Sequence, residues 1–292
     1  MEIFWGLSAA LSFGLADFAS RFSSRKEGPL KTLLYLQLFG IPVALLIAAL
    51  GGGINWNNIN SFAGILGILV CFELTFGNFL LYRALALGPV IIVSPITSSS
   101  AAITLVLSLL SGEKLQLIQA FGVGATLIGV IVAAIPYEHT VHGMVAGANY
   151  GIADRKTSGI PSAVGAAILF GFGIWLLRFV VPIVGSQTIP LLYRVSSLSL
   201  LLVIFGAFRR NPKLESNSSI KWLLAIGFLD TIAFWFLSIG LTTGLTSIVS
   251  VITSLYSIVT MVLGYLFLGE RLAGTQKAGI ALTLTGVALV SL

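Results

Sequence analysis

The chain carries one stretch of sequence twice, and this repetition constrains its fold more than any other feature. The first copy is GEKLQLIQAFGVGATLIGV from Gly112 to Val130, and the second is GERLAGTQKAGIALTLTGV from Gly269 to Val287. Matching residues lie 157 positions apart. The same separation aligns further pairs, among them Phe13 with Phe170, Gly14 with Gly171 and Arg21 with Arg178. We therefore predict two copies of one unit, residues 1–135 and 158–292, joined by a linker at 136–157.

The composition decides the solvent in which these units fold. Hydrophobic residues make up 57% of the 292 residues and charged residues 9%, whereas a soluble domain has about 25% charged residues. Only lipid can cover so much apolar surface, so we predict an all-α integral membrane protein that crosses a cell membrane, inner or plasma, several times. Because only Glu2 precedes the first apolar run, we expect that run to be a retained helix.

Ten apolar runs are each long enough to cross the roughly 30 Å hydrocarbon layer, which takes about 20 helical residues. We predict ten transmembrane helices, near residues 3–21, 33–50, 62–82, 90–110, 115–135, 161–183, 189–208, 220–242, 246–267 and 272–292. Each repeat holds five helices, an odd number, so the second repeat must enter the membrane from the opposite side. This predicts two inverted five-helix repeats, with a substrate site near the midplane between them.

Positive residues in the loops predict the orientation. They gather after the first, third, fifth, seventh and ninth helices, whereas Lys114 lies on the other side. Those loops are therefore predicted to be cytoplasmic, and both termini are predicted to face away from the cytoplasm. The same distribution explains the net charge of +6, so no nucleic-acid partner is predicted.

The repeated turns carry a family resemblance. The paired G-E-[KR]-L turns before glycine-spaced helices, the small-residue helices that end in Arg21 and Arg178, and Tyr193-Arg194 together resemble the EamA family of the drug/metabolite transporter superfamily. The resemblance covers nearly the whole chain and implies a ten-helix secondary transporter of small organic metabolites, with amino acid exporters among its members. Two features depart from the family. Gln37 stands where the family often has an arginine, and the basic loops lie opposite to the usual arrangement with cytoplasmic termini.

Two acidic residues occupy equivalent positions inside apolar runs, Glu73 in 62–82 and Asp230 in 220–242. A charge at the bilayer centre costs at least about 2.5 to 3.5 kcal/mol, so an accidental pair is improbable. In one interpretation both line a central cavity and bind a cationic group or the protons that drive transport. In the other, each is neutral or paired with an intramembrane cation, for which Arg178 and Arg194 are available.

Other residues of these runs are candidates for the same site. The run 62–82 carries a polar stripe that includes Asn78 and Tyr82, while the equivalent positions in 220–242 are apolar and include Trp235. We expect Asn78, Tyr82 and Trp235 to shape the pocket, although Trp235 equally fits a packing role.

Aromatic residues beside charge add to the candidates. Trp175 and Tyr193 lie next to Arg178 and Arg194, and such rings can cage an amine. Arg194 is predicted to meet a substrate carboxylate.

The runs 90–110 and 246–267 carry hydroxyl side chains on one face. We expect these small side chains to let the two helices approach closely, leaving Tyr256 for the cavity. Pro42 and Pro95 predict kinks. Gly129 belongs to a small-residue face that can pack within a monomer or between monomers, so monomer and homodimer both remain open.

Charged and ligand-type residues near helix ends are expected to be structural. Asp17 lies four residues before Arg21, a spacing that predicts an ion pair between them. The glutamates of the repeated turns, Glu113 and Glu270, are expected to cap helix ends. His139 and His142, in the linker, are expected to be solvated, because no cysteine or carboxylate stands at ligand spacing. We predict no metal and no cofactor.

Together these features predict a secondary active transporter that works by alternating access. Its partners would be the lipid bilayer and a small polar metabolite with an amino group, an amino acid or a related amine, with protons as the candidate coupling ion. No G-x-x-x-x-G-K-[ST] sequence supports ATP-driven transport. A passive channel or a membrane scaffold is the alternative. An intramembrane protease is disfavoured because no nucleophile and base surround the buried acids, so no enzymatic activity is predicted.

Overall fold

The structure is a computed structural model that describes residues 1–54, 56–134, 159–270 and 272–290. Every regular element in these ranges is helical. The helices are α1 (Glu2–Glu27), α2 (Pro29–Leu50), α3 (Trp56–Ile59), α4 (Phe62–Leu87), α5 (Val90–Ser98), α6 (Ser100–Leu110), α7 (Leu117–Ala134), α9 (Ile160–Val184), α10 (Ile189–Ala207), η2 (Asn217–Ser219), α11 (Ile220–Thr243), α12 (Thr246–Thr253), α13 (Tyr256–Leu268) and α14 (Gly274–Val290). The predicted linker at 136–157, with His139 and His142, lies outside the described residues.

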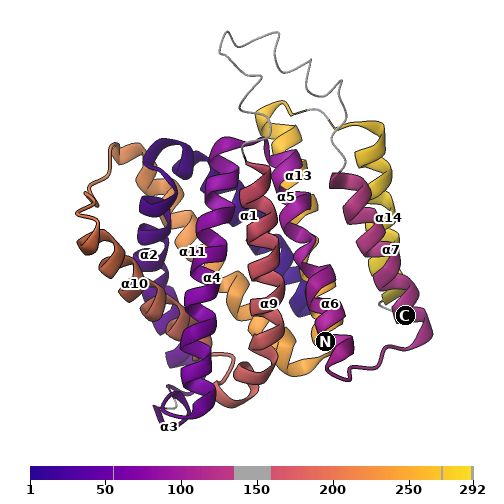
Figure 1. Ribbon diagram of the computed structural model, residues 1–292, viewed down its shortest axis with the longest axis horizontal. Helices are drawn as coiled ribbons and strands as arrows, with labels where there is room; N and C mark the ends of the chain where they lie inside the picture. Colours follow the sequence, from indigo (N-terminus) through magenta and orange to yellow (C-terminus); the bar gives the residue numbers. More distant parts are fainter. Residues whose placement is uncertain (55, 135–158, 271, 291–292) are drawn as a thin grey trace.

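Within the described ranges, eight helical segments are long and apolar enough to cross a membrane. Two of these segments are interrupted, one between α5 and α6 and the other between α12 and α13. The shorter helices α7 and α14, of 18 and 17 residues, lie side by side at the edge of the bundle (Figure 1). Large apolar side chains such as Leu46, Phe121 and Leu202 are exposed on the outside, as expected for surfaces that lipid covers.

Both interrupted segments break where hydroxyl side chains bond to carbonyls of the preceding turn. Ser99 Oγ donates to Ile96 O at 2.7 Å, and Ser254 Oγ donates to Val251 O at 2.6 Å. Such local bonds compete with the regular helical ladder. The kink predicted near Pro95 is therefore observed as a break at Ser99, one turn later, whereas α2 continues through Pro42.

The helix pairs with the most extensive contacts join the two predicted repeats. α1 packs along α11, α4 along α9, and α7 along α14. The hydroxyl-rich segments also contact each other, α5 with α13 and α6 with α12, as the sequence predicts. Two hydroxyls bond to repeated glycines of the other half: Thr104 Oγ1 donates to Gly171 O at 2.8 Å, and Thr260 Oγ1 donates to Gly14 O at 3.1 Å.

The small-residue face of α7 packs against α14 within one chain. A Cβ atom on Gly129 would lie 2.5 Å from the backbone nitrogen of Thr283 and 2.7 Å from Gly279 O, closer than real contacts allow. Glycine is required here because the two backbones touch.

Gly129→Ile is expected to force α7 away from α14 and to lower the melting temperature of the detergent-solubilised protein. Overpacking of this kind costs about 1–3 kcal/mol, and more where backbone must move. Gly124→Ile in the same helix is the control, because a Cβ atom there meets nothing within 4 Å. Equal melting temperatures for the two variants would contradict the expectation.

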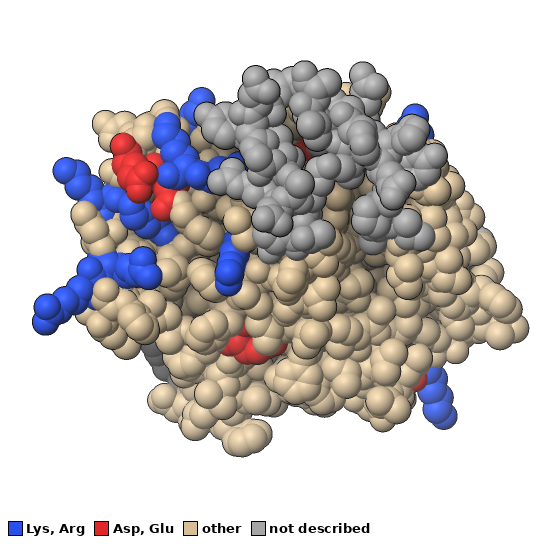
Figure 2. Space-filling view, turned by 45° about the horizontal axis from the view of Figure 1, so that its top comes forward, with Lys and Arg blue, Asp and Glu red and all other residues tan. Residues whose placement is uncertain are grey.

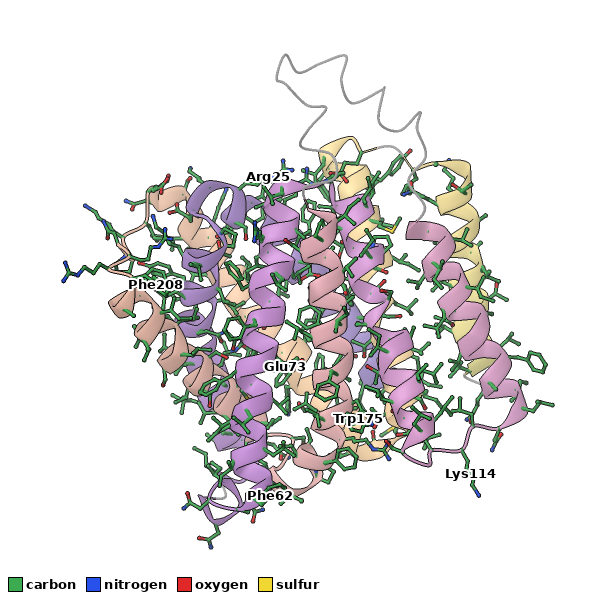
Figure 3. All side chains as sticks on the ribbon, viewed as in Figure 1. Arg25, Phe62, Glu73, Lys114, Trp175 and Phe208 are labelled. Atoms are coloured by element: carbon green, nitrogen blue, oxygen red, sulfur yellow. The ribbon has the colours of Figure 1, made fainter. Side chains whose placement is uncertain are left out.

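The two ends of the bundle differ in charge. Figure 3 places Arg25 at one end and Lys114 at the other. We call the first the basic end, because the C-terminal ends of α1 and α10 bring positive residues there, and these side chains gather on one face in Figure 2. The other end, which holds the starts of α1 and α7 and the last residue of α14, is called the terminal end (Figure 1).

Candidate functional site

A cavity lies inside the bundle and draws its walls from both predicted repeats. Eight helices contribute to its lining: α1, α4, α6, α9, α10, α11, α12 and α13. Phe13 and Phe170, which the repeat aligns with each other, both line it. The other aromatic and polar lining residues are Asp17, Asn78, Ser100, Tyr193, Asp230, Phe234, Thr253 and Tyr256.

Asp230 lines this cavity but is already paired. Its Oδ2 accepts a hydrogen bond from Nη2 of Arg194, which is fully buried at 0% exposure. Nη1 of Arg194 donates to Gln37 Oε1 at 2.9 Å, and Nε donates to Thr231 Oγ1 at 3.1 Å. Asp230 is therefore paired with an intramembrane cation, as one interpretation predicts, and it also lines the cavity, as the other predicts. The prediction that Arg194 meets a substrate carboxylate finds no support in this geometry, because Arg194 does not line the cavity.

Asp17 also lines the cavity, although its spacing from Arg21 predicts an ion pair instead. The predicted pair with Arg21 is wrong, because the guanidinium of Arg21 binds the carboxylate of Glu270. Asp17 is only 5% exposed and borders the cavity. Its carboxylate has no hydrogen bond or ion pair within the part of the chain that the structure describes. Its position four residues after Phe13 was the available signal, since both fall on one helical face.

Glu73 occupies a different environment from Asp230 despite their equivalent sequence positions. It lies midway along α4 (Figure 3) and packs against Gly173 of α9, not against the cavity. Both carboxylate oxygens are buried without a hydrogen-bond partner among the described residues. A carboxyl group in such surroundings is most stable uncharged.

Glu73→Gln is expected to leave folding and substrate transport almost unchanged, because glutamine copies the size and charge of a neutral carboxyl group. The expected change in melting temperature corresponds to less than about 1 kcal/mol. Transport measured in liposomes checks the second part. A loss of pH-dependent transport in this variant would instead identify Glu73 as the coupling residue.

Of the remaining candidate site residues, some line the cavity and others lie outside its lining. Asn78 lines the cavity and donates from Nδ2 to Tyr193 Oη at 2.8 Å. Tyr256 lines it and donates to Thr97 Oγ1 at 3.0 Å. The other three lie outside the lining: Tyr82 in an apolar cluster, Trp235 against Phe236, and Trp175 with its indole donating to Ser111 Oγ at 2.9 Å.

The repeated glutamates hold the two ends of the bundle together. At the basic end, Glu270 pairs with Arg21 and accepts hydrogen bonds from the backbone N–H groups of Val90 and Ile91 at 3.3 and 3.0 Å, which caps α5. Carboxylates are favoured at helix N-termini, where N–H groups are free. The prediction that Glu270 caps a helix end is therefore confirmed, and the helix belongs to the other half of the chain.

An equivalent arrangement occurs at the terminal end. Glu113 accepts from the backbone N–H groups of Thr246 and Ser247 at 3.1 Å each, which caps α12, so this prediction is confirmed too. Its Oε1 lies 3.2 Å from Nη1 of Arg178, close enough for an ion pair but without hydrogen-bond geometry. Among the described residues, no group of three His, Cys, Asp or Glu side chains could hold a metal ion.

Comparison with known proteins assigns the fold to a family. The model of the EamA-like transporter family matches this sequence twice, at residues 1–135 and at residues 157–292. The chain belongs to the EamA-like transporter family. The predicted resemblance is therefore confirmed. This EamA-like protein is a multi-pass membrane protein, and its family points to a transporter and away from an enzyme.

Individual relatives cover the chain to different extents. A "Probable amino-acid metabolite efflux pump" of Escherichia coli (strain K12) is 39% identical over 118 residues, which are 39% of this chain and only 38% of that relative. An uncharacterised protein of Methanocaldococcus jannaschii is 33% identical over 136 residues, 46% of this chain and 96% of the relative. A solved crystal structure covers 99% of this chain and 95% of its own at a TM-score of 0.72 and 18% identity, which shows a shared fold.

Proposed function

We propose that this protein is a secondary active transporter that carries a small polar metabolite with an amino group through the central cavity by alternating access. The observation that carries the proposal is the cavity itself, which draws walls from both halves of the chain and holds a buried acid that has no partner among the residues the structure describes. Ligand sites of secondary transporters lie near the midplane, between structural repeats. The name of the Escherichia coli relative, an amino-acid metabolite efflux pump, supports an amino-group substrate.

The proposal includes ten membrane helices in two inverted repeats, residues 1–135 and 158–292. Equivalent contacts at opposite ends support it. Arg21 and Arg178 are equivalent residues, yet Arg21 pairs with Glu270 at the basic end and Arg178 pairs with Glu113 at the terminal end. Likewise α1 packs on α11, and the equivalent helices α9 and α4 pack on each other. Matching contacts at opposite ends are what an inverted repeat produces.

Two ion pairs, Arg21 with Glu270 and Arg178 with Glu113, each join the two halves of the chain. They are suited to close the transport path alternately. At the basic end the side chains of Arg21 and Glu270 are 9% and 3% exposed, whereas at the terminal end those of Arg178 and Glu113 are 21% and 6% exposed. The basic end also has Gln276, whose Nε2 donates to Ile91 O and Ala133 O at 3.3 Å. The basic end is therefore closed more tightly. In the other half of the cycle, the terminal pair would tighten and the basic pair would separate.

Exchange transport separates this proposal from its alternatives. Purified protein in liposomes loaded with unlabelled amine or amino acid should accumulate the same labelled compound transiently and saturably, because one carrier site faces each side in turn. A passive channel would conduct without stimulation from the opposite side, and a scaffold would give no flux. Accumulation driven by an imposed pH gradient would support protons as the coupling ion, and its absence would remove that part of the proposal.

Tags attached to the two ends of the chain test the proposed orientation. Because positive residues gather at the basic end, that end is expected to be cytoplasmic and both termini are expected outside. Tags at residue 1 and residue 292 should react with a membrane-impermeant reagent in intact cells. Cytoplasmic tags at both ends would contradict the orientation and would leave the transport proposal intact.

A further inference from the structure

The charges at the cavity do not balance. Among the described residues, two acids border it and no lysine or arginine does. Asp230 is neutralised by its ion pair with Arg194. Asp17 has no such partner in the described part of the chain, and the other charge that acts on it is the negative charge of Asp230. Asp17 is therefore the one acid at the cavity without a counter-charge among the described residues. Like Glu73, it is most stable uncharged while no ligand is bound, and a cation that enters the cavity would stabilise its charged form.

Arg194 cannot serve as the positive group for a substrate. It is fully buried, and each of its three nitrogens donates a hydrogen bond, to Asp230, Gln37 and Thr231. The backbone of α2 closes over it, since a Cβ atom on Gly40 would lie 2.7 Å from Nε. To bind a carboxylate, Arg194 would have to leave Asp230 buried and unpaired, which is strongly unfavourable.

The two helix breaks also offer little to a carboxylate. Helix N-termini bind anions through free backbone N–H groups. Here the N–H groups of Ser99, Leu255 and Ser257 are used by bonds to Ile96 O, Ile252 O and Ser254 O at 3.3, 3.1 and 3.2 Å. At each break, part of the backbone N–H groups that could bind an anion is therefore already used.

The walls of the cavity suit a positive group instead. Five aromatic residues line it, Phe13, Phe170, Tyr193, Phe234 and Tyr256, and the rest of the lining is aliphatic or uncharged apart from the two acids. Aromatic faces attract ammonium and guanidinium groups, most strongly where water is excluded. An acid among aromatic rings is the combination that recognises an organic cation.

We propose that the cavity selects compact organic cations, amines or guanidines without a free carboxylate, and that Asp17 is the residue that determines this selectivity. This inference rests on the transport function proposed above and narrows its substrate class. A zwitterionic amino acid would place its carboxylate in an apolar, acidic cavity without a cationic partner, at a large desolvation cost. Removing or masking that carboxylate, by decarboxylation, esterification or amidation, should therefore strengthen binding.

A matched probe series tests the selectivity directly. Phenylalanine, its amide, its methyl ester and phenethylamine share one aromatic group and one amine and differ at the carboxylate. Binding to the detergent-solubilised protein, measured by calorimetry or thermal shift, should be at least about tenfold tighter for the three cations than for phenylalanine. Asp17→Asn should lose this preference, Asp17→Glu should keep it, and Glu73→Gln should behave as the unaltered protein does.

Each outcome of this series either supports or overturns the proposed selectivity for cations. Equal or tighter binding of phenylalanine overturns it, as does a full preference for cations in Asp17→Asn, or failure of every cation to bind at millimolar concentration. If Asp17→Asn does not fold, the comparison of Asp17→Glu with the unaltered protein across the four probes still tests the cation preference. Because binding is measured without a membrane gradient, cation-selective binding without counterflow would refute the transport function alone. Counterflow of phenylalanine but not of the cations would refute the selectivity alone.

Discussion

Glu270→Gln is expected to destabilise the protein more than the equivalent change Glu113→Gln. The substitution leaves Arg21 buried without a counter-charge, and breaking a buried pair in this way costs about 3–5 kcal/mol. Arg178 is more exposed than Arg21, so water can replace Glu113 at lower cost. The melting temperatures of the two variants in detergent measure the difference.

Hydrogen exchange localises the same effect. The N–H groups of Val90 and Ile91 bond to Glu270, whereas those of Thr246 and Ser247 bond to Glu113. Glu270→Gln should therefore speed exchange at the start of α5, and Glu113→Gln should speed it at the start of α12. Equal losses of melting temperature, or faster exchange at the wrong helix, would contradict the unequal closure of the two ends.

Arg194→Gln is expected to cost a similar amount, about 3–5 kcal/mol, because it leaves Asp230 buried and unpaired. The double variant Arg194→Gln/Asp230→Asn should recover most of the lost stability, since it removes both charges and leaves two amides that can bond to each other. Thermal unfolding of the two variants in the same detergent checks this order. If the double variant is no more stable than the single one, Arg194 stabilises the fold through its other contacts.

The double variant also separates the two interpretations of Arg194. If the arginine held a substrate carboxylate, the double variant would lose amino acid binding even when folded. If it only neutralises Asp230, the cation preference set by Asp17 should persist. The buried network of Arg194 with Gln37, Thr231 and Asp230 favours the second result.

Several parts of the structure follow directly from sequence pattern. The hydroxyl faces of α5–α6 and α12–α13 predict that these segments contact each other. The positions of Glu113 and Glu270 in the repeated turns predict that they cap helices. Asn78, Asp230 and Tyr256 line the cavity, as their sequence positions predict. These features could be predicted because they depend on local spacing and on the cost of placing polar groups in lipid, both of which are readable from a single chain.

Other parts could not be predicted, because they depend on which helix faces which. Glu73 and Asp230 are equivalent in sequence, yet Asp230 meets Arg194 while Glu73 meets Gly173 of α9. Asp17 and Arg21 have the spacing of an ion pair, but a longer-range partner, Glu270, takes the arginine. A spacing rule describes one helix in isolation and contains no information about competing groups from distant segments.

The sequence by itself determined that the chain is a helical membrane protein of the EamA-like transporter family, because duplication and hydropathy can be recognised without knowing which residues are in contact. Only the tertiary structure decided where the charges go. The packing of α10 against α2 and α11 encloses Arg194 with Asp230. The packing of the two halves against each other places Arg21 beside Glu270. Asp17 is thereby left as the cavity acid without a counter-charge among the described residues. In a membrane interior a buried charge is stable only beside an opposite charge, and which residues meet is decided by helices far apart in sequence.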